Sequence, residues 1–232
     1  MEQDLVRKEF DDVSGRYGDA VSEAIPIAGA SSSYFIKVKA EYLLDEIRKS
    51  GNPADMKALD LGCGVGSFHP YLKDKFATLT GVDISEQSLA QARQNNSFVD
   101  YIAYDGENLD VADDSQDVVF ASCVLHHVPL EKRAIFMSNA FRILKPGGLM
   151  LIFEHNTRNP LTRKTIKACP FDDDAIMLPP SELTALFKTA GFHQSKTTYI
   201  LNLPTFGRVT RKLDGVIGVL GMGAQYYVKA IR

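Results

Sequence analysis

Several features that would assign this chain of 232 residues to a specialised class are scarce or missing. It has only three cysteines, without a CxxC pair, which argues against a disulfide framework and against a zinc knuckle. No segment reaches the ~18 consecutive apolar residues of a membrane span, and the charged N-terminus lacks the apolar stretch of a signal peptide. A formal net charge of −3 gives no electrostatic reason to expect nucleic acid. We therefore expect a cytoplasmic protein with reduced thiols.

The chain instead shows an alternation of strand and helix patterns. Its composition, 45% hydrophobic and 24% charged, is ordinary for a globular protein. Periodicity and turn residues predict helices at 34–50, 67–76, 85–95, 129–145 and 179–192, and strands at 57–62, 77–85, 99–106, 114–125, 148–156, 196–203 and 224–231. This order implies a mostly parallel sheet covered on both faces, with ligands beyond the carboxyl ends of the strands. A helical cap at 1–50 precedes the main domain at 51–232, which has a loop-rich insertion near 156–178.

One short stretch, ALDLGCGVGSF at 58–68, joins the first strand to the next helix. Its glycines Gly62, Gly64 and Gly66 indicate a tight turn that a ligand approaches closely, beside helix amides that favour anionic groups. Asp83 ends the second strand 17 residues after Gly66 and is placed to accept from two ribose hydroxyls. Asp105 ends the third strand, where a carboxylate can accept from an adenine amino group. The alternative is that both aspartates only form turns.

These segments, followed by DVVFASCVLHHV and LKPGGLMLI, resemble the class I S-adenosylmethionine-dependent methyltransferases over roughly residues 55 to 155. The resemblance implies a Rossmann-like, doubly wound α/β fold with a seven-stranded, mostly parallel sheet, helices on both faces and an antiparallel last strand. It implies S-adenosyl-L-methionine as cofactor and S-adenosyl-L-homocysteine as product. It also implies these cofactor-binding residues: Asp60, Gly62, Cys63, Gly64, Gly66, Asp83, Ile84, Asp105, Gly106 and Cys123.

Candidate catalytic groups follow the fourth and fifth strands. They are His126, His127, Glu154 and His155, each a residue type that can remove a proton from an acceptor. Buried structural imidazoles are the alternative for the histidine pair, and we expect no metal, because adjacent histidines diverge. Tyr17, Tyr34 and Asn156 are expected to contact the substrate.

We therefore expect a methyltransferase acting on a small-molecule acceptor, with oxygen as the first choice of acceptor atom and nitrogen or carbon next. A non-catalytic protein that binds the cofactor is an alternative, and a nicotinamide oxidoreductase is less favoured because its loop usually reads GxGxxG. Segment 205–223 groups Arg208, Arg211 and Lys212 before an apolar run. It is either an amphipathic element that meets a membrane or a lipid-linked acceptor, or a core-packing helix, and the second interpretation is favoured. The sequence determines neither the acceptor nor the oligomeric state.

Overall fold

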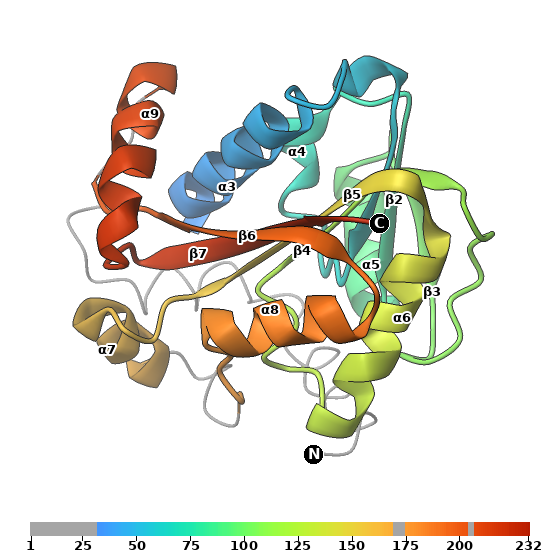
Figure 1. Cartoon of the computed structure of the whole chain (residues 1–232). Helices are drawn as coiled ribbons and strands as arrows, with labels where there is room; N and C mark the ends of the chain where they lie inside the picture. The colour runs from blue at the N-terminus through green and yellow to red at the C-terminus, as the bar shows by residue number, and fades with distance from the viewer. Residues whose placement is uncertain (1–31, 169–174, 204–206) are drawn as a thin grey trace.

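The computed structural model describes residues 32–168, 175–203 and 207–232. Tyr17, one of the expected substrate contacts, lies outside these ranges. The described residues form one seven-stranded sheet in the order β3-β2-β1-β4-β5-β7-β6 (Figure 1). Its strands are β1 (Lys57–Leu61), β2 (Thr78–Asp83), β3 (Asp100–Ala103), β4 (Gln116–Ser122), β5 (Leu144–His155), β6 (His193–Ile200) and β7 (Gln225–Ile231).

The direction of the strands decides which residues share an edge. Strands β1 to β5 pair in parallel, so their carboxyl ends lie at the same edge of the sheet. Strand β7 runs antiparallel to both β5 and β6, and its first residue, Gln225, therefore lies opposite His155 at that edge. The predicted Rossmann-like sheet with an antiparallel last strand is confirmed.

Helices cover both faces of the sheet (Figure 1). The short elements are the 3₁₀ turns η1 (Pro53–Asp55), η2 (Leu130–Lys132) and η4 (Gly218–Leu220). The α-helices are α3 (Ser32–Ile47), α4 (His69–Leu72), α5 (Glu86–Asn95), α6 (Arg133–Ile143), α7 (Pro160–Ala168), α8 (Pro180–Thr189) and α9 (Arg208–Ile217).

Alternation along the buried strands divides the core into two clusters. In β5, Leu151 and Phe153 pack with α3 and α4, whereas Met150 and Ile152 pack with α6 and α8. Side chains of a strand alternate between the two faces of a sheet, so a strand buried on both sides reads as a continuous apolar run. This explains why β4 and β5 are the most hydrophobic strands of the chain.

Two predicted elements differ from the structure. The helix expected at 67–76 is reduced to α4, because Lys73 leaves the helical conformation with a ψ of 131° and Asp74 follows with a left-handed φ of 59°. The insertion expected to be loop-rich contains helix α7. Asn159 caps α7, since its Oδ1 accepts from the backbone N–H groups of Leu161 and Thr162.

Candidate functional site

The glycine loop turns sharply at the carboxyl end of β1. Gly62, Gly64 and Gly66 all have positive φ, of 85°, 52° and 72°. The backbone N–H groups of Gly62 and Cys63 both donate to the carbonyl of Val82, at 2.7 and 2.9 Å. These bonds attach the loop to β2, and non-glycine residues rarely adopt this backbone.

The three glycines are needed for different reasons. A Cβ on Gly62 would lie 2.5 Å from the side chain of Val124, and one on Gly66 would lie 2.8 Å from the Tyr101 hydroxyl. A Cβ on Gly64 would meet no atom of the described residues within 4 Å. Gly62 and Gly66 therefore permit close packing within the protein, whereas Gly64 faces open space. That open side fits a ligand lying against bare backbone.

Asp83 lies beside this open space at the end of β2. Its carboxylate accepts from the backbone N–H of Gly64 at 2.7 Å and from that of Ser85 at 3.0 Å. Burial raises the pKa of the Asp83 carboxyl to about 6, although these two N–H groups act to lower it. A carboxyl group whose ionised form is disfavoured by burial and which lies beside an open space is typical of a functional site.

Asp60, on β1, belongs to a buried polar chain under the loop. Its Oδ2 is 3.2 Å from Nε2 of His69, and Nδ1 of the same ring is 2.6 Å from the Tyr101 hydroxyl. Burial raises the pKa of Asp60, opposed by His69 and Lys39. His69 was missed by sequence reasoning. It fixes the first turn of α4 relative to the loop.

The expected adenine residues lie at the next strand end. Asp105 is exposed, and its carboxylate accepts from the backbone N–H groups of Glu107 and Asn108, at 2.8 and 2.6 Å. These bonds and the Asn108 side-chain amide hold the pKa of Asp105 below its ordinary value. Gly106 follows with a φ of 85°, and Ile84 is partly buried. Asp105 thus forms the turn that was its alternative interpretation, with a carboxylate that still reaches solvent.

Lys39 enters the site from helix α3. Although it is a lysine, it is only 6% exposed, and its Nζ donates to the hydroxyl of Ser122 at 2.8 Å and to Sγ of Cys123 at 3.4 Å. The same ammonium lies 5.6 Å from the centre of the Phe68 ring. A buried cation therefore lies at the end of β4, between the glycine loop and the strand ends.

The two described cysteines have opposite electrostatic surroundings. Burial and the nearby Asp83 and Asp60 carboxylates raise the pKa of the Cys63 thiol well above its usual range. Burial acts on Cys123 in the same direction, but Lys39 and His155 outweigh it and lower the Cys123 pKa to about 6. Cys123 therefore carries a thiolate at neutral pH, beside the Lys39 ammonium.

Glu154 and His126 form a buried pair. The Glu154 carboxylate lies 2.5 Å from Nδ1 of His126 and accepts from the backbone N–H of Leu125 at 3.0 Å, and both side chains are 1% exposed. Burial raises the pKa of Glu154, but the charge and hydrogen bond of His126 outweigh it and lower the pKa. Both carboxylate oxygens are thus engaged inside the protein. This geometry suits positioning of the histidine better than direct contact with an acceptor.

The other two candidate bases stand next to this pair. The rings of His126 and His127 are 4.2 Å apart between centroids, and those of His126 and His155 are 5.4 Å apart. His155 is the more exposed of these rings, and its Nδ1 is 3.5 Å from Nε2 of Gln225. Gln225 Nε2 also lies 3.8 Å from Cys123 Sγ, and its Oε1 is buried without a partner among the described residues.

The expected substrate contact of Asn156 is wrong in this structure. Asn156 is fully buried, and its amide donates to the carbonyls of Gly221 and Gly223, at 2.9 and 2.7 Å. Its Oδ1 accepts from the backbone N–H of Arg158 at 3.1 Å. The side chain therefore joins two segments of the framework. Tyr34, on α3, is partly buried and packs edge-on against Phe35.

Sequence reasoning missed Lys39, His69 and Gln225. A signal existed for Lys39, because all its neighbours on the same helix face are apolar or aromatic, namely Phe35, Ile36, Tyr42 and Leu43. Gln225 gave no comparable signal, since only its antiparallel pairing brings it to this edge. Within the described part of the chain, no group of three or more histidine, cysteine, aspartate or glutamate side chains has the geometry to hold a metal ion.

Comparison with known proteins agrees with this geometry. A family model described as "Methyltransferase domain" matches residues 59–152. A Mycolicibacterium smegmatis protein named "Probable S-adenosylmethionine-dependent methyltransferase" is 29% identical over 77% of this chain and 70% of its own length. The ubiquinone biosynthesis O-methyltransferase of Thiobacillus denitrificans is 30% identical over 62% of this chain and 68% of its own. The chain matches only 37% of a malonyl-[acyl-carrier protein] O-methyltransferase of Pectobacterium atrosepticum.

Solved structures share the whole architecture at low identity. A SAM-dependent methyltransferase from Thermotoga maritima superposes with a TM-score of 0.67 and 20% identity, covering 98% of both chains. The [4+2]-cyclase SpnF superposes with a TM-score of 0.70 and 15% identity, covering 100% of this chain and 97% of that one. These structural similarities show the fold, and the sequence relatives show the reaction class, which is methyl transfer from S-adenosylmethionine. The chain belongs to the class I S-adenosylmethionine-dependent methyltransferase family.

Proposed function

We propose that this methyltransferase acts on an oxygen atom of a small organic acceptor, and that the acceptor lies against His155 at the carboxyl edge of the sheet. The observation that carries the proposal is that His155 and Cys123 lie at the same edge as the open side of Gly64. Relatives named as O-methyltransferases support oxygen over nitrogen or carbon. A lipid-linked acceptor is compatible with those names.

The cofactor is proposed to lie across the glycine loop. Asp83 would accept hydrogen bonds from the ribose hydroxyls. The Asp105–Gly106 turn and Ile84 would border the adenine. Lys39 supplies a buried cation for the carboxylate of the methionine part, and Asp60 lies near enough to favour its ammonium. The open space at Gly64 and the buried charges of both signs fit such a zwitterionic ligand.

The chain's own groups then prepare the acceptor. When bound, the cofactor supplies an electrophilic methyl group on a sulfonium sulfur. His155 would take the proton from the acceptor hydroxyl, which leaves the acceptor oxygen free to act as the nucleophile toward that methyl group. Glu154 and His126 act by holding the neighbouring rings, while His127 lines the same wall. Alignment of this kind contributes about 7–11 kcal/mol, so a base adds to a barrier already lowered by positioning.

The test uses cofactor labelled in its methyl group, the whole protein and a panel of catechols, hydroquinones and amines. The expected product is a labelled methyl ether. His155→Asn should lower kcat about 100-fold or more. His193→Asn is the matched control, because His193 is exposed at the start of β6 and should leave kcat unchanged. A labelled amine, or a His155→Asn enzyme with full activity, would contradict the oxygen acceptor or the base.

A further inference from the structure

Helix α9 has its polar and apolar sides reversed relative to an ordinary surface helix. Its inward residues are Arg211, which is 7% exposed, and Asp214, which is fully buried. The face that points outward consists of Val209, Leu213 and Val216 of α9 and Val219, Leu220 and Met222 from η4 and the following turn, each at least 51% exposed. We call these six residues the α9 face. Surface helices normally bury the apolar stripe and expose the polar one.

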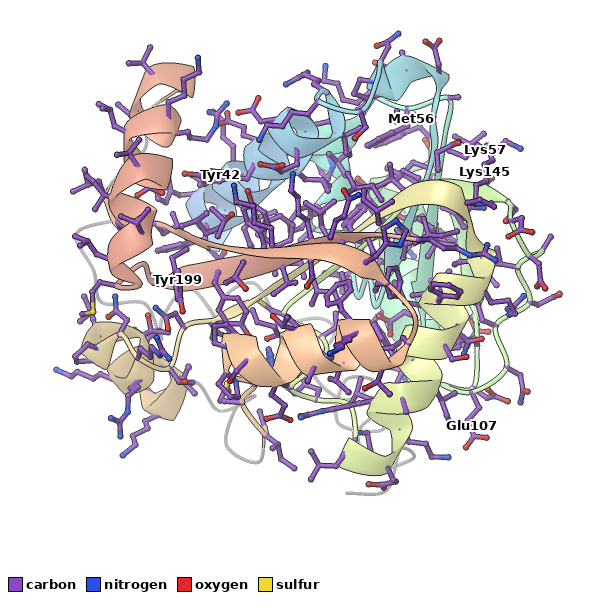
Figure 2. All side chains as sticks on the ribbon, viewed as in Figure 1. Tyr42, Met56, Lys57, Glu107, Lys145 and Tyr199 are labelled. Atoms are coloured by element: carbon purple, nitrogen blue, oxygen red, sulfur yellow. The ribbon has the colours of Figure 1, made fainter. Side chains whose placement is uncertain are left out.

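The inward polar side chains are fully engaged, which makes the reversal a stable arrangement. The Asp214 carboxylate accepts from the Tyr42 hydroxyl at 2.7 Å and from the backbone N–H groups of Leu201, Asn202 and Leu203 at 2.8, 2.7 and 3.0 Å. Figure 2 labels Tyr42 on the side of α3 that faces α9. These bonds determine which side of α9 faces outward.

Arg211 makes the second attachment of α9 to α3. Its guanidinium pairs with the carboxylates of Glu41 and Asp45, the latter at 3.0 Å. Rotating α9 to bury its apolar side would break these hydrogen bonds and ion pairs and leave the buried Asp214 carboxylate without its partners. The apolar residues are therefore held in solvent by the fold.

Cations surround the α9 face. Lys212 is exposed at its margin, and helix α7 exposes Arg163, Lys164 and Lys167 at the same end of the molecule (Figure 1). Neither helix has an exposed acidic residue, because α7 contains none and the single one in α9 is the buried Asp214. This local charge is opposite in sign to the formal net charge of −3.

Hydrogen bonds connect α7 to the segment that follows η4, which contributes Met222 to the α9 face. Asn159, which caps α7, donates from its side chain to the carbonyl of Met222 at 2.6 Å, and Thr162 donates to that of Ala224 at 2.9 Å. Aliphatic side chains near exposed lysine and arginine, on two helices that themselves carry no exposed acid, match the pattern of elements that lie in a membrane interface. We propose that the α9 face, together with the cations of α7, binds the surface of an anionic lipid bilayer.

A second copy of the chain fits the surface less well than a bilayer does. A second copy of the chain, related by two-fold symmetry, would bring the lysines of one face against those of the other, and like charges disfavour that contact. A bilayer needs no spanning segment here, and no helix of the described residues is long and apolar enough to cross a membrane. Asn156, directly after β5, donates to the carbonyls of Gly221 and Gly223 and so attaches the segment after η4 to the carboxyl edge of the sheet. The lipid proposal does not depend on methyl transfer.

The test is co-sedimentation of the whole protein with vesicles, in the absence of cofactor and acceptor. Vesicles of phosphatidylcholine mixed with phosphatidylglycerol should retain the protein, and those of phosphatidylcholine alone should retain much less. Raising the salt concentration should weaken the binding, because exposed charges are screened. Equal sedimentation with both vesicles, or none with either, would overturn the proposal and leave the methyltransferase assignment intact.

Amino-acid substitutions separate the contributions of charge and of apolar contact to vesicle binding. Replacing Lys164, Lys167 and Lys212 by glutamine should weaken binding to anionic vesicles about 100-fold, since each lysine near such a surface contributes about five-fold. The matched control replaces Lys75 and Lys188, which are exposed on other parts of the chain, and should bind as the wild type does.

A second variant set removes apolar contact from the α9 face. Leu213→Gln with Leu220→Gln should lower vesicle binding at least about ten-fold, whereas Leu130→Gln, at a site 54% exposed elsewhere, should not. All three residues are exposed, so the fold should be retained, as circular dichroism would show. If the wild type instead sediments as a dimer in the ultracentrifuge, and the double variant is monomeric with unchanged vesicle binding, the face joins two copies and the lipid proposal is wrong.

Discussion

Replacing Asp83 by asparagine is expected to weaken cofactor binding while leaving the chain at least as stable as before. Burial raises the pKa of this carboxyl from 3.8 to about 6, which corresponds to about 3 kcal/mol against the charged form at neutral pH. Asparagine removes that charge. It can accept from only one of the two backbone N–H groups, Gly64 or Ser85, and loss of the other bond costs about 1–3 kcal/mol. The free energy of unfolding at pH 7 should therefore stay the same or rise by up to about 2 kcal/mol.

The pH dependence of stability follows from the direction of the same shift. The folded chain holds the Asp83 proton up to about pH 6, whereas the unfolded chain releases it near pH 4. Because the folded state binds more protons in that window, the contribution of this group to the free energy of unfolding falls as pH rises from about 4 to about 6. Urea unfolding at several pH values should show this slope in the wild type and its absence in Asp83→Asn.

Although the stability of Asp83→Asn should be retained, its affinity for the cofactor should fall. Loss of one charge-assisted hydrogen bond is worth about 1.5–3 kcal/mol, or about 10- to 150-fold in Kd. Calorimetry with S-adenosylhomocysteine should show this loss at pH 7. Wild-type affinity should itself fall about ten-fold between pH 7 and pH 5 as the carboxyl is protonated, and the variant should not respond.

A matched control makes the result specific. Asp100→Asn alters an exposed carboxylate at the start of β3, at the opposite edge of the sheet, and should change neither affinity nor its pH dependence. If Asp83→Asn binds S-adenosylhomocysteine within about three-fold of the wild type at pH 7, Asp83 is a turn-forming residue and the proposed ribose contact is wrong.

Three further outcomes follow from the geometry. Gly62→Ala, which combines a φ of 85° with a Cβ 2.5 Å from a neighbouring side chain, should lose about 2–4 kcal/mol of unfolding free energy in urea, whereas Gly64→Ala should lose about 1–2 and weaken cofactor binding. Iodoacetamide should alkylate Cys123 with half-maximal rate near pH 6, with little reaction at Cys63, as peptide mass spectrometry would show; equal rates would contradict the assigned thiolate. Asp214→Ala should cost about 3–5 kcal/mol and expose the 201–203 backbone amides to hydrogen exchange; unchanged protection would mean that α9 is held by other contacts.

Local sequence patterns were sufficient for the framework and for half of the site. Strands β1 and β2, the glycine loop and the acid at position 83 were all predicted, because each depends on residues within a few positions of one another. Helix α7 was missed although its cap, Asn159, was visible, since Leu161 and Ile166 are the only large aliphatic residues among its nine. The candidate bases lie in or after the carboxyl ends of β4 and β5, whereas the partners that hold them were not predicted, and their catalytic role stays a prediction.

The sequence by itself determined the order of strands and helices, the left-handed turns at glycine and the edge of the sheet at which the candidate site lies. Only the tertiary structure decided that Lys39 reaches Ser122, 83 residues away, and that Gln225 meets Cys123 across 102 residues. It also decided that the Glu154 carboxylate is hydrogen-bonded to His126, and that α9 presents its apolar side to solvent. Local preferences act over about one helical turn, whereas these contacts depend on strand direction and on which buried polar groups find partners when the whole chain packs.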